Sequence, residues 1–357
     1  MANLQSIAVL GLGKIGRLSA ELLMGCGFDV LGVDTRPPRD APFSCQMVDL
    51  RDHTALVVAL KGQDAVLSCL PYALNTQVAK AAHRGGLHYF DLTEDVATTR
   101  AIRTMAETAT AAMAPQCGLA PGFVGIVGAD LILKLECCRS CRMRVGALPQ
   151  NPSGLMGYSF NWSPEGVVNE YLNDCEVLEN GEIKMVSPME WVERIVIDGT
   201  ALEAFTTSGG LGTMCETYRG RVSDIDYKTM RYPGHVTLMN FFFHELLMRD
   251  RRKEAGEILV HAKPPVEDDI VYIHVAAEGL LDGKLVRREF VCGLKPMEVA
   301  GRVRTAIAWT TASSVAAVIE MVAQGALPQR GFLKQEDIPL PAFLSTKNGK
   351  RFAEAMR

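Results

Sequence analysis

The chain has 357 residues, of which 48% are hydrophobic and 22% are charged, and its formal net charge is −4 at pH 7. This length predicts two lobes, and this composition excludes a disordered or fibrous protein. A net negative charge disfavours nucleic acid as the partner, so we expect a small-molecule ligand.

The apolar segments argue against export and against a membrane span. The run Ile7–Leu10 has no basic segment before it and stops at a glycine, so we expect no signal peptide. The longest uncharged stretch, Thr108–Ala129, is broken by Pro115 and Pro121. Ten cysteines without a secretory signal favour reduced thiols. We therefore expect a cytoplasmic protein without membrane contact.

Residues 1–122 alternate short apolar runs with helical patterns, which is typical of a parallel sheet covered by helices on both faces. A helix is expected over Asn75–His83, where Val78, Ala81 and Ala82 share one face. The expected strands are Ile7–Leu10, Val30–Asp34, Met47–Leu50, Ala65–Leu70, His88–Asp91 and Ala112–Pro115. The predicted fold class is therefore α/β, with an N-terminal Rossmann domain built on a doubly wound parallel sheet.

The regular alternation fails after about residue 123, and residues 123–300 read as a second, α+β domain for substrate binding and dimerisation. A helix is expected to begin near Pro164. Strands are expected at Arg142–Ala147, Ile195–Ile197, Ile270–Ala277 and Leu285–Cys292. Residues 301–357 form a third segment, in which a strong helical pattern over Val303–Ala323 predicts a helix that returns to the Rossmann domain.

A glycine-rich motif, Gly11-Leu12-Gly13-Lys14-Ile15-Gly16, follows the first predicted strand and opens a predicted helix. The first glycine allows a tight turn, the second lets the backbone approach a pyrophosphate, and the third lets the helix pack on the strand. Asp34 ends the second predicted strand, where a carboxylate would accept hydrogen bonds from the adenosine ribose. The motif therefore predicts a bound nicotinamide dinucleotide.

The choice between NAD and NADP depends on two neighbouring side chains. Asp34 would repel a 2′-phosphate and favours NAD, whereas Arg36 would hold one and favours NADP. We predict NAD, with NADP as the alternative.

Four further segments carry a resemblance, and they occur in both predicted lobes. They are Pro71–Lys80 (PYALNTQVAK), Cys117–Gly122 (CGLAPG), Leu202–Gly210 (LEAFTTSGG) and Tyr227–His235 (YKTMRYPGH). With the glycine motif they resemble the saccharopine dehydrogenase family, and within it the lysine 6-dehydrogenase branch. The resemblance implies an enzyme that oxidises a carbon–nitrogen bond of an amino acid, or reduces the matching imine, with a nicotinamide cofactor.

Two segments depart from the patterns of that family. Ala120 stands where the saccharopine branch often carries an acid, and Asn161–Gly166 (NWSPEG) has a tryptophan and a proline that the lysine branch usually lacks. Oxidative deamination of a lysine-like amino acid is the expected reaction. The alternatives are an opine-type enzyme acting on a secondary amine, as on saccharopine or a carboxylated polyamine, and a non-catalytic nucleotide sensor.

The resemblance and the chemistry of the side chains suggest site residues. Arg231 is placed in the substrate pocket by the resemblance, where its planar fork suits a carboxylate; a structural salt bridge is the alternative. The other substrate-binding candidates are Tyr72, Thr93 and Tyr232. The candidate catalytic groups are Asp91, His235 and Glu165. Further cofactor contacts are expected from Lys14, Ile15, Thr35, Arg36, Leu70, Pro71, Asp91, Gly118 and Pro121, beside Gly11, Gly13, Gly16 and Asp34.

Each candidate catalytic group also has a structural explanation. His235 titrates in the range of a general base, but a lone histidine is often structural. Asp91 and Thr93 face the expected nicotinamide region or cap a helix. Glu165, together with Glu170, binds a distal substrate amine or caps and solvates a helix.

Neither a metal nor a reactive thiol is expected. Cys138 and Cys141 have the spacing of half a zinc site, but no second pair completes four ligands. Cys117 lies beside the CGLAPG turn, yet hydride transfer requires no thiolate. The predicted assembly is a homo-oligomer, most simply a dimer.

Overall fold

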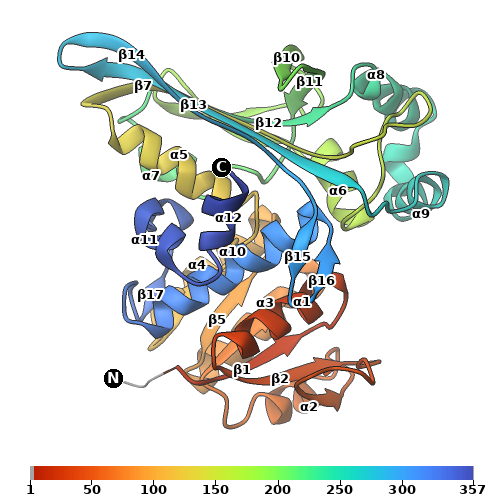
Figure 1. Cartoon of the computed structure of the whole chain (residues 1–357), viewed down its shortest axis with the longest axis vertical. Coiled ribbons are helices and arrows are strands. Elements are labelled where there is room, and N and C mark those ends of the chain that lie inside the picture. Colours follow the sequence, from red (N-terminus) through yellow and green to blue (C-terminus); the bar gives the residue numbers. More distant parts are fainter. Residues whose placement is uncertain (1–3, 357) are drawn as a thin grey trace.

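The computed structural model describes residues 4–356, which form two large sheets, one in each lobe (Figure 1), and a separate two-stranded hairpin. The first sheet has seven parallel strands in the order β17-β6-β5-β4-β1-β2-β3. These strands are β1 (Ser6–Leu10), β2 (Asp29–Asp34), β3 (Ser44–Met47), β4 (Ala65–Ser68), β5 (His88–Asp91), β6 (Ala112–Ala114) and β17 (Gly331–Phe332). The predicted Rossmann arrangement is confirmed.

Helices cover both faces of this sheet, because alternate residues of its strands point to opposite sides. Ile7 and Val9 of β1 belong to one apolar cluster with α1 (Lys14–Gly25) and α10 (Ala306–Ala323). Ala8 and Leu10 belong to another apolar cluster, on the opposite face of the sheet. The helices on that side are α2 (His53–Ala59), α3 (Tyr72–Gly85) and α4 (Val96–Ala106).

The second lobe is built on a mixed sheet of long strands in the order β10-β11-β12-β7-β13-β14. The strands are β7 (Cys137–Pro149), β10 (Glu193–Ile197), β11 (Thr200–Thr206), β12 (Asp224–Arg231), β13 (Asp269–Leu281) and β14 (Lys284–Leu294), with a side hairpin of β8 (Cys175–Glu179) and β9 (Glu182–Val186). Its helices are α5 (Phe123–Leu133), α6 (Pro164–Leu172), α7 (Met214–Tyr218), α8 (His235–Asn240) and α9 (Arg252–Ala262), with η1 (Phe241–Glu245) and η2 (Met248–Arg251) between the last two.

The C-terminal segment returns to the first lobe. A short hairpin of β15 (Met297–Val299) and β16 (Arg302–Arg304) leads into α10, which packs against α1 and β13. By length and composition α10 is able to cross a bilayer, but 89% of it is buried inside the fold, so it acts as a core helix here. The chain then adds β17 to the first sheet and ends with η3 (Gln335–Asp337), α11 (Leu340–Ser345) and α12 (Lys350–Ala355).

Two predicted elements were placed wrongly. The strand expected at Met47–Leu50 lies at Ser44–Met47, because Asp52 accepts hydrogen bonds from Thr54 N and Ala55 N and so starts α2 soon afterwards. The helix expected from Val303 begins at Ala306, since residues 302–304 pair with 297–299 as a hairpin. The carboxylate of Asp269, far away in sequence, accepts hydrogen bonds from Ala306 N and Ile307 N (3.0 Å) and caps α10.

Candidate active site

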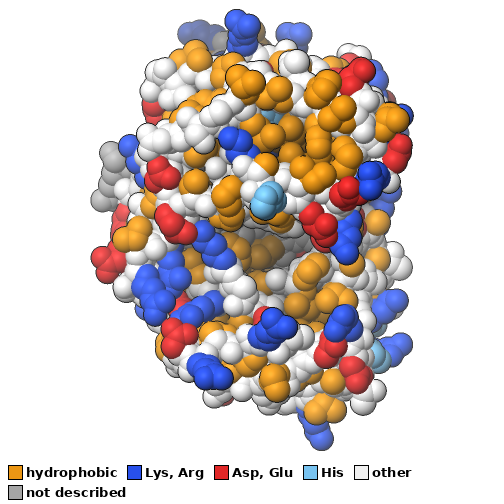
Figure 2. Space-filling view, turned by 90° about the vertical axis from the view of Figure 1, so that its right-hand side faces the viewer, with side chains coloured by type: hydrophobic (Ala, Val, Ile, Leu, Met, Phe, Trp, Pro, Cys, Tyr) orange, Lys and Arg blue, Asp and Glu red, His pale blue; other side chains and the backbone are white. Residues whose placement is uncertain are grey.

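A cavity of about 640 Å³ lies between the two lobes and opens to solvent; Figure 2 shows the hollow at mid-height. The first lobe contributes the glycine loop, the start of α3 and the loops after β5 and β6. The second lobe contributes the segment that leads into α6, the helix α9 and the end of β12. The cavity is therefore bounded by the predicted cofactor motif on one side and by the family-like segment Tyr227–His235, with α6 and α9, on the other.

The glycine loop has the geometry that its spacing predicts. Gly11 has φ +86°, and a Cβ on Gly16 would lie 1.8 Å from the Gly11 carbonyl oxygen, so neither position tolerates a side chain. A Cβ on Gly13 would meet nothing within 4 Å. Gly13 lines the cavity directly before the N-terminus of α1, whose free N–H groups attract an anion. The open space beside Gly13 fits a dinucleotide pyrophosphate.

Asp34 lies next to the glycine loop but does not line the cavity. Its carboxylate accepts hydrogen bonds from Leu12 N (2.6 Å) and Arg36 N (2.8 Å). Partial burial opposes ionisation, but these N–H groups outweigh it and lower the pKa of Asp34. A charged carboxylate therefore stands where the adenosine ribose of a bound dinucleotide is expected.

The loop after β5 carries two acids with different roles. Asp91 is buried and accepts hydrogen bonds from the Tyr89 hydroxyl (2.7 Å), Thr93 N (3.0 Å) and Gln116 N (2.9 Å), and its burial raises its pKa to about 6. It holds the ends of β5 and β6 together and does not line the cavity, so the predicted catalytic and cofactor contacts of Asp91 lack geometric support. Glu94, which the sequence reasoning missed, does line the cavity.

Glu94 packs closely against two glycines of the second lobe. A Cβ on Gly166 would lie 2.8 Å from Glu94 Oε1, and a Cβ on Gly209 would lie 2.5 Å from the Glu94 carbonyl oxygen. Burial raises the pKa of Glu94 to about 7, and the charges of Asp95 and Asp91 add to this effect. The segment LEAFTTSGG thus has a physical function, because its Gly209 lets the two lobes meet at this acid.

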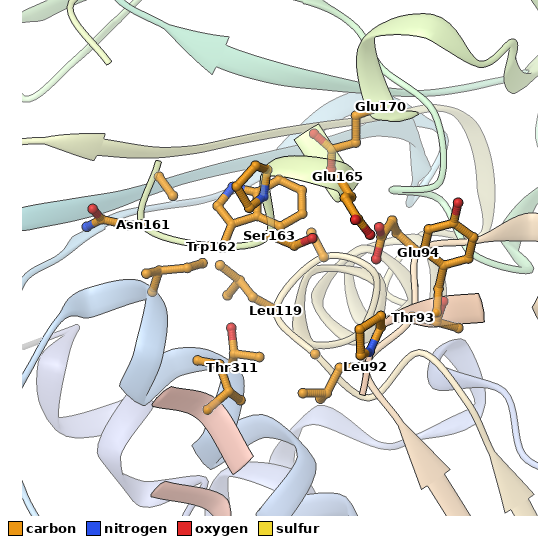
Figure 3. A pocket seen from close by; sticks show the side chains of 18 of the residues that line it. Leu92, Thr93, Glu94, Leu119, Asn161, Trp162, Ser163, Glu165, Glu170 and Thr311 are labelled. Atoms are coloured by element: carbon orange, nitrogen blue, oxygen red, sulfur yellow. The ribbon is translucent and has the colours of Figure 1, made fainter. Parts of the chain in front are cut away.

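Two more carboxylates reach the cavity from α6 (Figure 3). Glu165 lies in the first turn and is exposed, whereas Glu170 is only 5% exposed. Burial raises the pKa of Glu170 to about 8, with the Arg231 charge opposing and the Glu94 charge reinforcing this shift. Three carboxylates from two lobes therefore converge on one side of the cavity.

Arg231 ends β12 and lines the same cavity. It donates hydrogen bonds from Nε to the Tyr171 hydroxyl (2.9 Å) and from Nη1 to the Met230 carbonyl (2.9 Å). Its Cζ lies 4.4 Å from the centre of the Tyr158 ring. Burial disfavours the charged form, but the oxygens of Tyr158, Tyr171 and Glu170 outweigh this and raise its pKa. The guanidinium is held charged, without an ion-pair partner in residues 4–356.

Two of the residues predicted to act on the substrate, His235 and Tyr232, also lie outside the cavity lining. His235 is fully buried, its Nε2 lies 3.0 Å from the Tyr171 hydroxyl and its Nδ1 lies 3.1 Å from the Met156 carbonyl oxygen. Burial and the Arg231 charge lower the pKa of His235 to about 3, so it supports Tyr171 and cannot accept a substrate proton from this position. Tyr232 points elsewhere, and its hydroxyl donates to the Pro149 carbonyl (2.9 Å).

The remaining predicted residues divide by position. The cavity is lined by Gly13, Lys14, Ile15, Gly16, Leu70, Pro71, Tyr72, Thr93, Gly118, Pro121, Glu165 and Arg231. Outside its lining lie Gly11, Asp34, Thr35, Arg36, Asp91, Tyr232 and His235.

Glu94 was detectable in principle, since an acid three residues past the end of a predicted parallel strand lies at the edge where ligands bind. In the part of the chain that the structure describes, no cluster of three or more His, Cys, Asp or Glu side chains is arranged to hold a metal ion.

Family models match both lobes. Residues 7–117 match the saccharopine dehydrogenase NADP binding domain, and residues 118–346 match the saccharopine dehydrogenase C-terminal domain. The boundary between the two matches falls in the loop after β6, within the CGLAPG segment.

Curated relatives are distant in sequence. A saccharopine dehydrogenase [NADP(+), L-glutamate-forming] of Pyricularia oryzae is 21% identical over 321 residues, covering 82% of this chain and 70% of that protein. The corresponding enzyme of Schizosaccharomyces pombe is 27% identical over 41% of this chain and 34% of its own length. A mitochondrial alpha-aminoadipic semialdehyde synthase of Rattus norvegicus is 23% identical over 51% of this chain, and only 21% of its length is matched.

Solved structures extend the likeness to the whole fold. Saccharopine dehydrogenase (L-Glu forming) of Saccharomyces cerevisiae superposes with a TM-score of 0.75 at 16% identity, covering 95% of this chain and 97% of that one. An engineered D-amino acid dehydrogenase bound to NADP+ superposes with a TM-score of 0.51 at 13% identity, covering 98% of each chain. At these identities the superpositions establish the fold alone.

Proposed function

The chain belongs to the saccharopine dehydrogenase family of nicotinamide-dependent oxidoreductases, and from this premise we propose that it oxidises a carbon–nitrogen bond of a lysine-like amino acid to an imine. One observation carries the proposal. The glycine loop and the Arg231 guanidinium, which lie more than 200 residues apart in sequence, face the same cavity. A dinucleotide and an anionic substrate bound to these two walls would meet inside it.

The residues that would hold the cofactor are those of the first lobe. The N-terminus of α1 and the open space beside Gly13 suit the pyrophosphate, and Asp34 suits the adenosine ribose. When bound, the nicotinamide accepts a hydride from the carbon that carries the amine. Because Asp34 is ionised and would repel a 2′-phosphate, we expect NAD to be preferred, although the saccharopine dehydrogenases of Pyricularia oryzae and Schizosaccharomyces pombe carry NADP(+) in their names.

Glu94 is our candidate for the group that accepts the amine proton. It follows the carboxyl end of β5, the edge of the sheet where nicotinamides lie, and the pKa of about 7 makes it an effective base near neutral pH. As the hydride leaves carbon, the nitrogen loses its proton to this carboxylate and a C=N bond forms. Water then adds to the imine carbon, and ammonia leaves to give a semialdehyde.

Arg231 would hold a substrate carboxylate remote from the reacting carbon. Its ring partners and hydrogen bonds fix the guanidinium in place, so the bound end of a flexible substrate would be anchored before reaction. Arg231 is 2% and Glu170 is 5% exposed, so the part of the cavity that they line lies deep in the protein. This burial supports the exclusion of water from the bound substrate.

A screen of amino acids and polyamines for NADH or NADPH formation tests the proposed function. The screen is repeated in reverse with NADH or NADPH, ammonia and carbonyl compounds, and then with amino acids in place of ammonia. Formation of reduced cofactor with a lysine-like amino acid and release of ammonia supports deamination. Amino-acid-dependent oxidation of reduced cofactor with a carbonyl compound would instead identify an opine-type enzyme. Size-exclusion chromatography tests the predicted homodimer.

A further inference from the structure

Glu170 is a deeply buried acid that the proposed hydride and proton transfers leave unused. It is 5% exposed and lines the cavity, and its carboxylate has neither a hydrogen bond nor an ion pair within residues 4–356. Its backbone is fixed, because its carbonyl oxygen accepts a hydrogen bond from Ser208 N (3.1 Å). Figure 3 shows the side chain reaching from α6 toward the cavity. A buried carboxylate without a partner is unfavourable unless a ligand supplies one.

Arg231, a cation, is likewise buried and likewise has no ion-pair partner within residues 4–356. It is 2% exposed and is held by Tyr171, Tyr158 and the Met230 carbonyl, none of which is an anion. A guanidinium has five N–H donors, so these contacts leave donors for a ligand in the cavity.

A second arginine of the same sheet provides a matched comparison. Arg144 on β7 is also 2% exposed, and it forms ion pairs with Glu193 and Asp226. Arg231 and Glu170 lie close enough for each charge to affect the pKa of the other, yet no ion pair joins them. The fold thus pairs one buried arginine internally, and it leaves the other without an ion pair in a cavity that Glu170 also lines.

We infer that Arg231 and Glu170 form a subsite for the zwitterionic headgroup of a free α-amino acid, with the carboxylate on Arg231 and the ammonium on Glu170. This inference deepens the proposed function, on which it rests, by assigning the oxidised amine to the far end of the substrate. The carboxylate of this ligand pairs with the Arg231 guanidinium, and its ammonium favours the ionised form of Glu170 and pairs with it. A diamine or a simple carboxylic acid supplies only one of these two contacts. Glu170 is accordingly a specificity-determining residue, distinct from the proton acceptor Glu94.

The test measures binding by calorimetry in the presence of NADH and, separately, NADPH, so that no amine is oxidised during the titration. The probes are two matched pairs, L-lysine with 6-aminohexanoate and L-glutamate with glutarate; the second member of each pair lacks only the α-amine. We expect the wild-type protein to bind at least one amino acid about tenfold or more tightly than its matched acid. In Glu170→Gln the preference should fall to about twofold or less, through weaker binding of the amino acid alone.

Glu176→Gln is the matched control, since Glu176 is a half-buried acid of the same lobe outside the cavity, and it should keep the full preference. Equal binding within both pairs by the wild-type protein, or an unchanged preference in a folded Glu170→Gln variant, would overturn the inference. The test is independent of turnover. If the α-amine preference depends on Glu170 while no amine yields reduced cofactor, the proposed oxidation fails and the headgroup site stands.

Discussion

The two walls of the cavity are built in different ways. The cofactor wall contains the continuous stretch Gly13–Gly16, in which the absence of side chains at the two glycines matters most. The substrate wall consists of the side chains of Glu94, Glu165, Glu170 and Arg231, which come from three separate segments. The difference teaches that cofactor binding depends on local space, whereas substrate choice depends on charges that only the packing of the two lobes brings together.

The largest effect is expected from a substitution that blocks cofactor binding alone. Gly13→Val should weaken dinucleotide binding by about 100-fold or more, because the branched side chain fills the space of the pyrophosphate. The fold should persist, since a Cβ at Gly13 meets no protein atom within 4 Å. Calorimetry with NAD and NADP measures the affinity for the cofactor, and a thermal melt of the cofactor-free protein measures its stability.

Gly16→Val is the contrast, because its Cβ would overlap the Gly11 carbonyl and should impair folding as well. Retained affinity in folded Gly13→Val would make the motif a purely structural turn.

The next effect concerns the acid where the two walls meet. Glu94→Gln should lower kcat/KM by about 100-fold, the usual contribution of a general base. The wild-type enzyme should lose kcat/KM as the pH falls below about 7, because a carboxyl group whose pKa is raised to about 7 is protonated there and cannot accept a proton. A pH profile of kcat/KM measures this.

The variant should lack that limb of the profile, while Glu107→Gln, an exposed acid at the end of α4, should keep it. A wild-type profile that is flat between pH 6 and 8, or an active Glu94→Gln variant, would exclude Glu94 as the proton acceptor.

The substrate wall is tested by a charge-conserving change. Arg231→Lys keeps a cation but loses the planar fork and the Nε hydrogen bond to Tyr171, so kcat/KM should fall roughly tenfold or more. Dinucleotide affinity should stay unchanged, because the change lies on the other wall. Steady-state kinetics and cofactor titration separate the two, with a thermal melt as the control for folding. Normal turnover by this variant would assign Arg231 a supporting role in the second lobe.

The smallest expected effect is on the preference of the enzyme for NAD over NADP. The wild-type enzyme should have the higher kcat/KM with NAD, and Asp34→Asn should raise kcat/KM with NADP by roughly tenfold, since it removes a charge that repels the 2′-phosphate. Equal or better kinetics with NADP in the wild-type enzyme would indicate that Arg36 dominates. Arg36→Ala would then lower kcat/KM with NADP specifically.

The cofactor wall was predictable because its determinants are local. A strand, a glycine turn and a helix follow each other within residues 6–25, and an aspartate ends the next strand. Each of these depends on neighbouring backbone geometry, which the order of residues largely dictates. The family-like segments were recognisable too, and Gly209 now has a physical reason in its contact with Glu94.

The roles of single polar residues were less predictable. His235 was a plausible base until its burial and its contacts with Tyr171 and Met156 became visible. Asp91 lies three residues from Glu94, yet it ties two strands together while Glu94 faces the cavity. Burial and partner decide the role of an ionisable group, and both arise from residues distant in sequence.

By itself the sequence determined the α/β class, the dinucleotide motif and the family, because these follow from periodicity and from short contiguous patterns. The tertiary structure alone decided where α10 begins, since its cap is the distant Asp269, and which acids face the cavity. It also decided that Glu170 and Arg231 line one cavity without forming an ion pair, while Arg144 pairs with Glu193 and Asp226. The physical reason is that charge pairing and desolvation act through space, between side chains whose separation along the chain carries no information about their distance in the fold.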